Sequence, residues 1–190
     1  MVDAMVEKVE SENTDGLFQR VRMDADALGR LYEMYYERIF RFCLHRLFVK
    51  EIAEDITSEI FLNVACKIRD FRGETETDFR NWLYAIAANH ANSYIRKTSR
   101  RKKLLEKASR SLTVDCRDEA SNPDWTQLYS AILKLKPKHQ TIVTLRFFED
   151  LGYRQIAKII NARTSTVRVG VHRALKKLRR HLQTVVDGDR

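Results

Sequence analysis

Residues 151–186 read LGYRQIAKIINARTSTVRVGVHRALKKLRRHLQTVV, and this stretch contains no Asp or Glu. Its nine basic residues are Arg154, Lys158, Arg163, Arg168, Arg173, Lys176, Lys177, Arg179 and Arg180. A surface of one charge repels itself, and a polyphosphate relieves that repulsion because each neutralised phosphate releases condensed counterions. The apolar spacing predicts a short helix, a tight turn and a longer helix, which together indicate a DNA-binding helix-turn-helix.

The two helices are expected over 153–160 and 164–182, with Asn161-Ala162-Arg163 as the turn and Thr164 as the N-cap of the second helix. The stripe predicted to be buried in the second helix is Val167, Val171, Ala174 and Leu178. The residues expected to meet DNA project from its other side: Ser165, Thr166, Arg168, Val169, His172, Arg173 and Lys176. The alternative for this side is a solvated basic helix face.

Composition favours an all-α fold of two small helical domains. The chain has 190 residues, 44% of them hydrophobic, with only 6 Gly and 2 Pro, and β-rich folds need more turn residues than this. The formal net charge of +9 favours an acidic partner. No uninterrupted apolar run reaches the roughly 18 residues of a membrane span, and the acidic N-terminus is unlike a signal peptide. We therefore expect a cytoplasmic protein without membrane insertion.

The three cysteines argue against a disulfide framework or a metal site. Cys43, Cys66 and Cys116 are odd in number and far apart, without C-x-x-C spacing. Cys43 and Cys66 lie in apolar helical patterns and are expected to be buried thiols, whereas Cys116 falls in a linker. No cofactor or metal is predicted.

Helical periodicity and composition divide the chain into four segments. Residues 1–15 are expected to be a flexible tail, and 16–97 a helical domain. A linker is expected over 98–124, basic at its start and turn-like at its end, followed by a second helical domain over 125–190. The second domain's first two helices are predicted at 125–135 and 138–149.

The segment 51–65 is predicted to be an amphipathic helix with an unusual polar face. Its buried stripe is Ile52, Ile56, Ile60 and Val64. The opposite arc carries Glu51, Glu54, Asp55, Ser58, Glu59 and Leu62. An apolar side chain among acids suggests a protein-docking surface, and the alternative is a solvated acidic face.

Several motifs resemble those of bacterial sigma factors. DLGYRQIA (150–157), STVR (165–168) and HRALKKL (172–178) resemble the C-terminal promoter-binding domain. AEDITSEIF (53–61) is similar to the helix that docks on the RNA polymerase clamp. FRG (71–73) and NWLYAIAAN (81–89) resemble the segment that opens and reads the −10 element. Two such domains joined by a short linker are typical of the extracytoplasmic function (ECF) subfamily.

The resemblance implies a sigma region 2 bundle followed by a sigma region 4 helix-turn-helix. It implies a non-enzymatic subunit that binds the clamp and flap surfaces of core RNA polymerase, directs it to promoter DNA, and is regulated by an anti-sigma factor. The acidic arc listed above would then bind polymerase, and the DNA-facing side of 164–182 would read the −35 element. The implied −10 DNA contacts are Phe71, Arg72, Gly73, Phe79, Asn89, Asn92, Arg96 and Lys97.

The chain departs from the family pattern at two places. Val169-Gly170 stands where Ser-Arg is common, which predicts an altered −35 preference or weaker phosphate clamping. Gly170 also costs about 1 kcal/mol relative to Ala inside a helix. The resemblance places a pocket that captures a −10 base at the polar stretch before Phe79. This stretch is longer and more acidic here than in the family, so the resemblance does not imply which base is captured.

Two other function classes are weaker. A helix-turn-helix regulator acting alone leaves the acidic helix and the −10-like segment unexplained. A tyrosine recombinase needs an H-x-x-R element, and no His in the chain has Arg three residues later. A metal nuclease needs clustered carboxylates in a cleft, whereas the acids at 51–59 lie on an amphipathic helix and lack a nearby His or Lys constellation.

Overall fold

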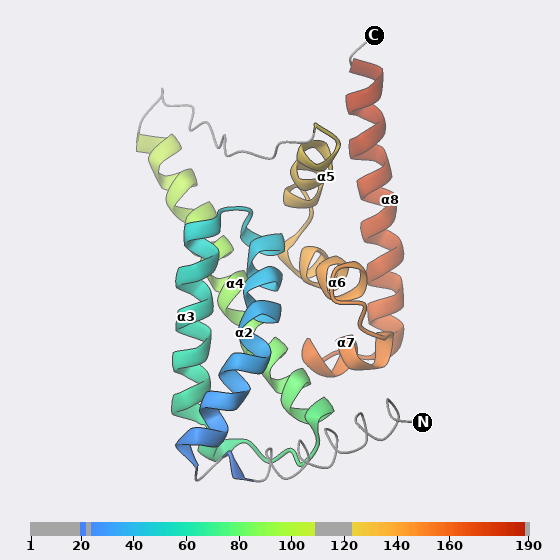
Figure 1. The fold of residues 1–190 in the computed structure, drawn as a ribbon. Helices are drawn as coiled ribbons and strands as arrows, with labels where there is room; N and C mark the ends of the chain where they lie inside the picture. The colour runs from blue at the N-terminus through green and yellow to red at the C-terminus, as the bar shows by residue number, and fades with distance from the viewer. Residues whose placement is uncertain (1–19, 22–23, 109–122, 189–190) are drawn as a thin grey trace.

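The computed structural model describes residues 20–21, 24–108 and 123–188, and the regular elements in these ranges are all helical. The N-terminal half comprises α2 (Ala25–Leu47), α3 (Lys50–Lys67), the short 3-10 helix η1 (Ile68–Asp70) and α4 (Glu76–Ala108). The C-terminal half comprises α5 (Pro123–Leu133), α6 (Pro137–Phe147), α7 (Tyr153–Ile159) and α8 (Thr164–Gly188) (Figure 1). The predicted all-α fold class is confirmed. The expected tail at 1–15 and Cys116 lie outside the described residues.

The N-terminal half is held together by apolar stripes of α2 and α3, of which the α3 stripe was described above from the sequence. Leu31, Tyr35 and Ile39 of α2 are at most 1% exposed, and Ile60 and Val64 of α3 pack in the same core. The Asp24 carboxylate accepts a hydrogen bond from the Asp26 backbone N–H at 2.9 Å and so caps the N-terminus of α2.

Helix α4 is longer at both ends than the sequence suggested. Its first turn is capped by Thr75, whose hydroxyl accepts from the Asp78 backbone N–H at 3.2 Å and donates to the Asp78 carboxylate at 2.7 Å. The helix therefore begins at Glu76, inside the stretch expected to be a loop. It ends at Ala108, beyond the expected linker start at 98, because 98–108 lacks Gly and Pro and is rich in good helix formers.

The C-terminal half contains the predicted helix-turn-helix, formed by α7 and α8. Val167, Val171, Ala174 and Leu178 are all at most 7% exposed, which confirms the buried stripe. The turn includes Asn161 at a φ of 47°, a conformation that Asn tolerates. Helix α8 begins at Thr164, and the Arg163 carbonyl accepts from the Val167 N–H at 3.2 Å. The cap position is therefore Arg163, and the assignment of Thr164 as N-cap is wrong by one residue.

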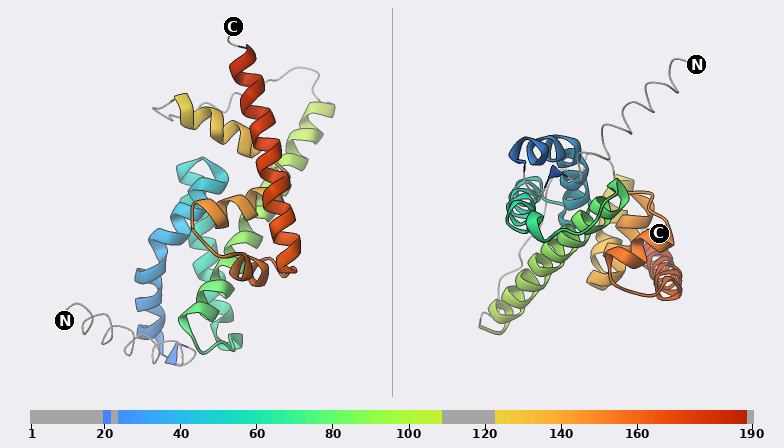
Figure 2. Two further views of the ribbon diagram at one scale, coloured as in Figure 1. Left: turned by 90° about the vertical axis from the view of Figure 1, so that its right-hand side faces the viewer. Right: turned by 90° about the horizontal axis from the view of Figure 1, so that it is seen from below.

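The two halves pack against each other. Helix α6 contacts α2 and α4, α7 contacts α4, and one hydrophobic core runs from the first half into the second. Seen from below, α4 lies between the α2–α3 pair and the C-terminal helices (Figure 2). A smaller core joins α5, α6 and α8 through residues such as Ile132, Val143 and Ala174.

The cysteines behave differently from one another. Cys43 is fully buried, as predicted, and burial raises the pKa of its thiol to about 12. Cys66 is exposed, so the prediction that it is buried is wrong. It follows the exposed Leu62 by four residues and therefore shares the solvent side of α3. Within the described ranges no helix is long and apolar enough to cross a membrane, and no cluster of metal-ligating side chains occurs.

Candidate protein and nucleic-acid interfaces

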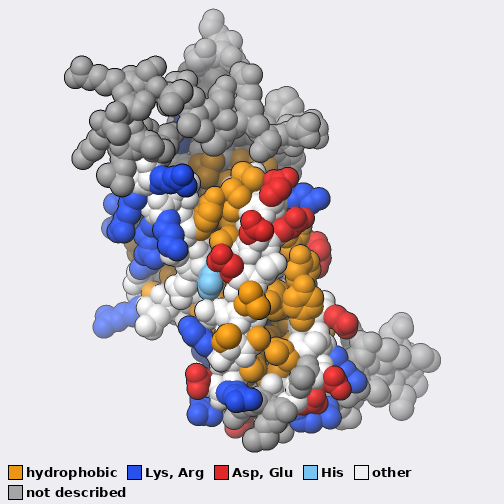
Figure 3. Space-filling view, turned by 90° about the vertical axis from the view of Figure 1, so that its left-hand side faces the viewer, with side chains coloured by type: hydrophobic (Ala, Val, Ile, Leu, Met, Phe, Trp, Pro, Cys, Tyr) orange, Lys and Arg blue, Asp and Glu red, His pale blue; other side chains and the backbone are white. Residues whose placement is uncertain are grey.

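The acidic arc of α3 is fully presented to solvent. All six of its predicted docking residues are exposed: Glu51, Glu54, Asp55, Ser58, Glu59 and Leu62. Leu62 is 67% exposed, the highest value among the large exposed hydrophobic side chains of the described residues. The view onto the α3 side of the molecule shows acidic and hydrophobic side chains gathered together (Figure 3). We call this surface the α3 face.

Aromatic side chains of α2 extend the apolar part of the α3 face. Tyr32 is 43% exposed, and its ring lies 4.8 Å from that of Phe61 on α3. Tyr36 stacks on Phe61 at 6.1 Å and on Phe40 at 6.4 Å. Sequence reasoning missed this extension, although positions 32, 36 and 40 share one helix face at i, i+4 and i+8. An apolar surface bordered by acids suits a basic protein partner.

The loop before α4 is built tightly around Gly73. A Cβ on Gly73 would lie 2.4 Å from Cζ of Phe71 and 2.6 Å from Cβ of Asp78, so only glycine fits here. The Phe71 ring meets Phe79 edge-on at 5.6 Å and lies 5.1 Å from Trp82. The cluster of Phe71, Phe79 and Trp82 thus supports the loop on its core side and fixes its path.

The structure separates the predicted −10 residues into three groups. The exposed ones, on the loop and along α4, are Arg72, Asn89, Arg96 and Lys97. Phe71 and Phe79, two of the implied −10 contacts, are only 4% and 0% exposed. Their rings are part of the core that supports the Gly73 loop. Asn92 is half-buried and lies at the boundary with the C-terminal half.

The predicted DNA-reading side of α8 is open. All seven of its residues are exposed: Ser165, Thr166, Arg168, Val169, His172, Arg173 and Lys176. The Arg168 guanidinium lies 5.7 Å from the centroid of the Tyr153 ring, which also carries Arg146 at 5.2 Å. These cation–π contacts orient Arg168 at the start of the recognition surface.

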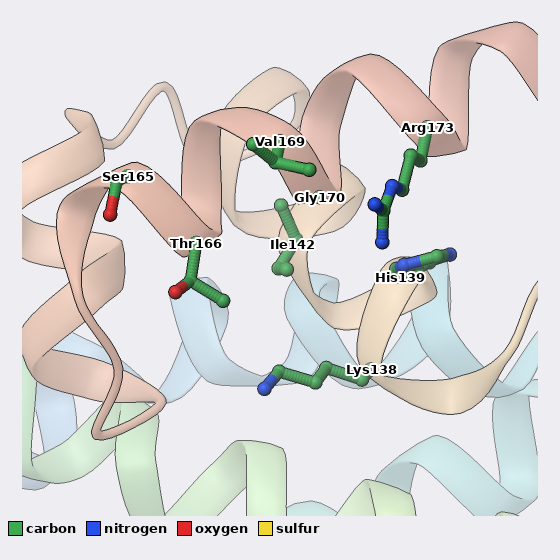
Figure 4. A pocket seen from close by; sticks show the side chains of 8 residues that line it. All are labelled: Lys138, His139, Ile142, Ser165, Thr166, Val169, Gly170 and Arg173. Carbon is green, nitrogen blue, oxygen red and sulfur yellow. The ribbon is translucent and has the colours of Figure 1, made fainter.

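Two neighbouring hollows run along α8 where it meets the start of α6. The first has a volume of about 400 Å³ and is lined by Lys138, His139, Ile142, Ser165, Thr166, Val169, Gly170 and Arg173 (Figure 4). The second, of about 340 Å³, is lined by Lys136, His139, Arg173, Lys176, Lys177 and Arg180. Burial and then four neighbouring cations lower the pKa of His139. This concentration of positive charge fits the phosphates of a nucleic acid. Lys138 and His139 were not among the predicted DNA contacts, because they lie outside the helix-turn-helix.

The structure gives Gly170 a packing role that the sequence did not reveal. Gly170 is buried, and a Cβ there would lie 2.9 Å from Cδ1 of Ile142. Its position faces α6 rather than open solvent. The interpretation of Gly170 only as a lost DNA contact is therefore incomplete, since its missing side chain lets α6 and α8 approach closely.

Comparison with known proteins agrees with this arrangement. Residues 31–101 match the family described as Sigma-70 region 2, and residues 125–178 match Sigma-70, region 4. The chain is 31% identical over 127 residues to the RNA polymerase sigma factor SigV of Bacillus subtilis, covering 67% of this chain and 74% of SigV. It is 30% identical over 167 residues to the ECF RNA polymerase sigma factor BldN of Streptomyces coelicolor, covering 84% of this chain but only 61% of BldN.

A solved structure has the same fold. The sigma factor RpoE, crystallised with the anti-sigma factor NepR from Bartonella quintana, superposes with a TM-score of 0.63 at 17% identity, covering 82% of this chain and 96% of RpoE. The matches to both sigma regions, in the order of the two halves described above, carry the assignment. The chain belongs to the sigma-70 family of RNA polymerase sigma factors, as a member of its ECF subfamily.

Proposed function

We propose that this sigma factor binds core RNA polymerase through the α3 face and directs it to specific promoters. In this proposal α4 and the Gly73 loop bind the −10 element, and α8 binds the −35 element. The observation that carries the proposal is the segregation of charge: the acids of α3 face one partner, and the acid-free segment 151–186 faces another. One chain can thus hold a basic protein surface and DNA at once.

The −10 element is proposed to meet the exposed residues of the loop and α4. Arg72 and Asn89 lie closest in sequence to the motifs of region 2 and supply hydrogen bonds to base edges. Arg96 and Lys97, further along α4, are proposed to hold the phosphate backbone of the upstream duplex. Phe71 and Phe79 are proposed to stiffen the loop, because both rings are buried.

The two halves are proposed to separate on polymerase. Promoter elements centred at −10 and −35 are roughly 25 base pairs apart, which is about 85 Å of B-DNA. A compact chain of this length has a radius of gyration of about 16 Å and cannot bridge that distance while its halves are packed together. In the proposed division, 16–97 acts as region 2, 125–190 as region 4, and 98–124 as the connection that lets them part.

An anti-sigma factor is the second proposed partner. RpoE from Bartonella quintana was crystallised with the anti-sigma factor NepR, and a protein of that class would hold the present chain in a form unable to engage polymerase. We place the protein in the cytoplasm, where polymerase and promoters are, and assign it no catalytic activity of its own. The clamp is the proposed contact of the α3 face, and the flap that of the C-terminal half.

Run-off transcription tests the proposal directly. Core RNA polymerase with and without the purified chain is given genomic fragments, and the start sites are mapped. Specific starts that depend on the chain support the proposal, and their absence refutes it. A gel shift on promoter duplex separates it from a regulator that acts alone, since such a regulator would bind the specific sequence equally well without polymerase.

A further inference from the structure

The hollow beside Gly170 combines two surfaces that rarely adjoin on a DNA-binding helix. One wall is apolar: Val169 is 47% exposed, and Thr166 lies one turn earlier on the same side of α8. The other wall carries the cationic side chains of Lys138 and Arg173, with His139 between them (Figure 4). The apolar wall has no charge that would attract a phosphate. The cationic wall carries charges that would not be buried in a protein core.

Gly170 and Ile142 both line the hollow where these walls meet. The missing side chain of Gly170 lets Ile142 pack directly on the α8 backbone, with only 2.9 Å between Cδ1 of Ile142 and the place of a Cβ on Gly170. A long side chain at this position would have to leave the packed interface and fill the hollow of about 400 Å³. The glycine therefore keeps Val169 accessible from the side on which DNA would approach.

Base chemistry decides which ligand suits the hollow. In the major groove only thymine presents a methyl group, at C5, whereas the other bases present hydrogen-bonding atoms or hydrogen there. Val169 has no hydrogen-bonding group and gains only from an apolar contact. A nucleotide that offers both a methyl group and a phosphate would satisfy both walls of the hollow at once.

We propose that Val169, in the hollow beside Gly170, reads the 5-methyl group of one thymine in the −35 element. Lys138 and Arg173 hold the backbone phosphates beside it. This inference rests on the proposed function and names a specificity-determining residue for it. Ser165 lines the same hollow but adds a hydroxyl rather than an apolar surface, so it does not share this role.

The test replaces thymine by uracil, which removes the methyl group and keeps every hydrogen-bonding atom. Holoenzyme formed from core polymerase and the full chain first selects binding sites from random duplexes made with thymine. Each thymine of the selected −35 element is then replaced singly by uracil, and holoenzyme binding is measured by competition. One position is expected to lose about fourfold in affinity, the equivalent of about 0.8 kcal/mol for one buried methyl group.

Variants assign the effect to the side chain. Val169→Ala removes both γ-methyl groups and should lower the thymine-to-uracil ratio at that position towards one. Leu133→Ala shortens an exposed apolar side chain of α5 and should leave the ratio as in the unsubstituted chain. A ratio of one at every thymine of the element overturns the inference, and so does discrimination that is undiminished in Val169→Ala. If holoenzyme selects no specific sequence at all, the proposed function fails and this inference falls with it. A selected sequence without methyl discrimination refutes only the inference.

Discussion

The guanidinium of Arg46 crosses the boundary between the two halves and donates a hydrogen bond to Oε1 of Gln140 at 2.5 Å. Its other terminal nitrogen donates to Oδ1 of Asn92 at 2.8 Å. Arg46 is 0% exposed, and burial lowers its pKa to about 10. The hydrogen-bond acceptors that the described residues give it are neutral amides, so this buried cation is compensated by dipoles alone. Of the two acceptors, Gln140 lies across the boundary, whereas Asn92 lies in the same half as Arg46 and also accepts from the Thr141 hydroxyl of α6 at 3.2 Å.

Gln140 is held in the orientation that Arg46 requires. Its side-chain N–H group donates to the carbonyls of Leu133 at 3.1 Å and Leu135 at 3.0 Å, at the end of α5 and just beyond it. The amide oxygen is thereby directed at the guanidinium. One side chain of α6 thus connects the end of α5 with α2.

Gln140→Met should open the boundary between the halves. Methionine has a similar size but cannot accept from Arg46, and a buried donor without a partner costs about 1–3 kcal/mol or more when charged. Small-angle X-ray scattering of the free protein should then give a radius of gyration well above the roughly 16 Å of the compact chain.

The control for this variant lies on the same helix. Lys138 is exposed and two residues from Gln140, so Lys138→Met should leave the radius unchanged. An equally compact Gln140→Met protein would show that Arg46 does not hold the halves together. A wild-type protein that is already extended would contradict the packed arrangement itself.

A second contact across the boundary should respond to pH. The Tyr84 hydroxyl donates to Oε2 of Glu149. Burial raises the pKa of Glu149 above its ordinary value, and it outweighs this hydrogen bond and the attraction to Arg41 and Arg38, all of which lower the pKa. The packed form therefore binds a proton more tightly than the opened form. Its stability should be greatest near and below the ordinary pKa of 4.5 and should fall as the pH rises through the raised value.

Glu149→Gln should remove this dependence, because glutamine stays neutral and its oxygen can still accept from Tyr84. Scattering or thermal unfolding followed from about pH 4.5 to pH 7 measures the effect. Identical pH profiles for the two proteins would exclude Glu149 as the responsible group.

Reversing one charge on the α3 face should weaken polymerase binding. Asp55 is exposed at the centre of the acidic arc. Glu59 is less suitable for this test, because its carboxylate lies 3.6 Å from Nδ1 of His90 and its reversal would also change that contact. Asp55→Lys is expected to lower the affinity for core polymerase about tenfold, and more at low salt. Fluorescence titration with core enzyme measures this, and Asp70→Lys, exposed beyond the end of α3, should bind normally. Unchanged affinity of Asp55→Lys would remove the α3 face from the interface.

Strong periodic patterns made much of the fold predictable. The stripes of α3 and α8 repeat every three or four residues, so burial of Ile60 and Val171 could be inferred from spacing alone. The end of α4 was missed because the sequence of 98–108 has no such apolar repeat, and only helix propensity favours it. The contact between the Phe71 and Phe79 rings could not be predicted, because the two residues lie on different elements.

Contacts between residues far apart in the chain could not be predicted from the sequence. Arg46 and Gln140 are 94 positions apart, and nothing in either segment marks the other as a partner. The role of Gly170 was hidden for the same reason, because it depends on Ile142 of another helix. Exposed residues of the polymerase and −35 surfaces were predictable, since their own helices determine which side they occupy.

Promoter binding should tighten as the pH falls and His139 becomes protonated. In the free protein, burial and then the positive charges of Lys177, Lys136, Arg173 and Lys138 lower the pKa of His139, which favours the neutral ring. A phosphate entering either neighbouring hollow would offset those charges and raise the pKa again, so the complex binds the proton more tightly than the free protein. Affinity for −35 duplex should therefore increase from about pH 7.5 to pH 6.

His139→Gln should flatten this profile, whereas His90→Gln, in the N-terminal half, should retain it. The measurement is holoenzyme binding to promoter duplex across that pH range at constant salt. Because the expected effect requires a phosphate near His139, the same titration with core polymerase and no DNA should show no contribution from this residue. A pH profile that is identical in His139→Gln and the unsubstituted protein would place the DNA backbone elsewhere than the start of α6.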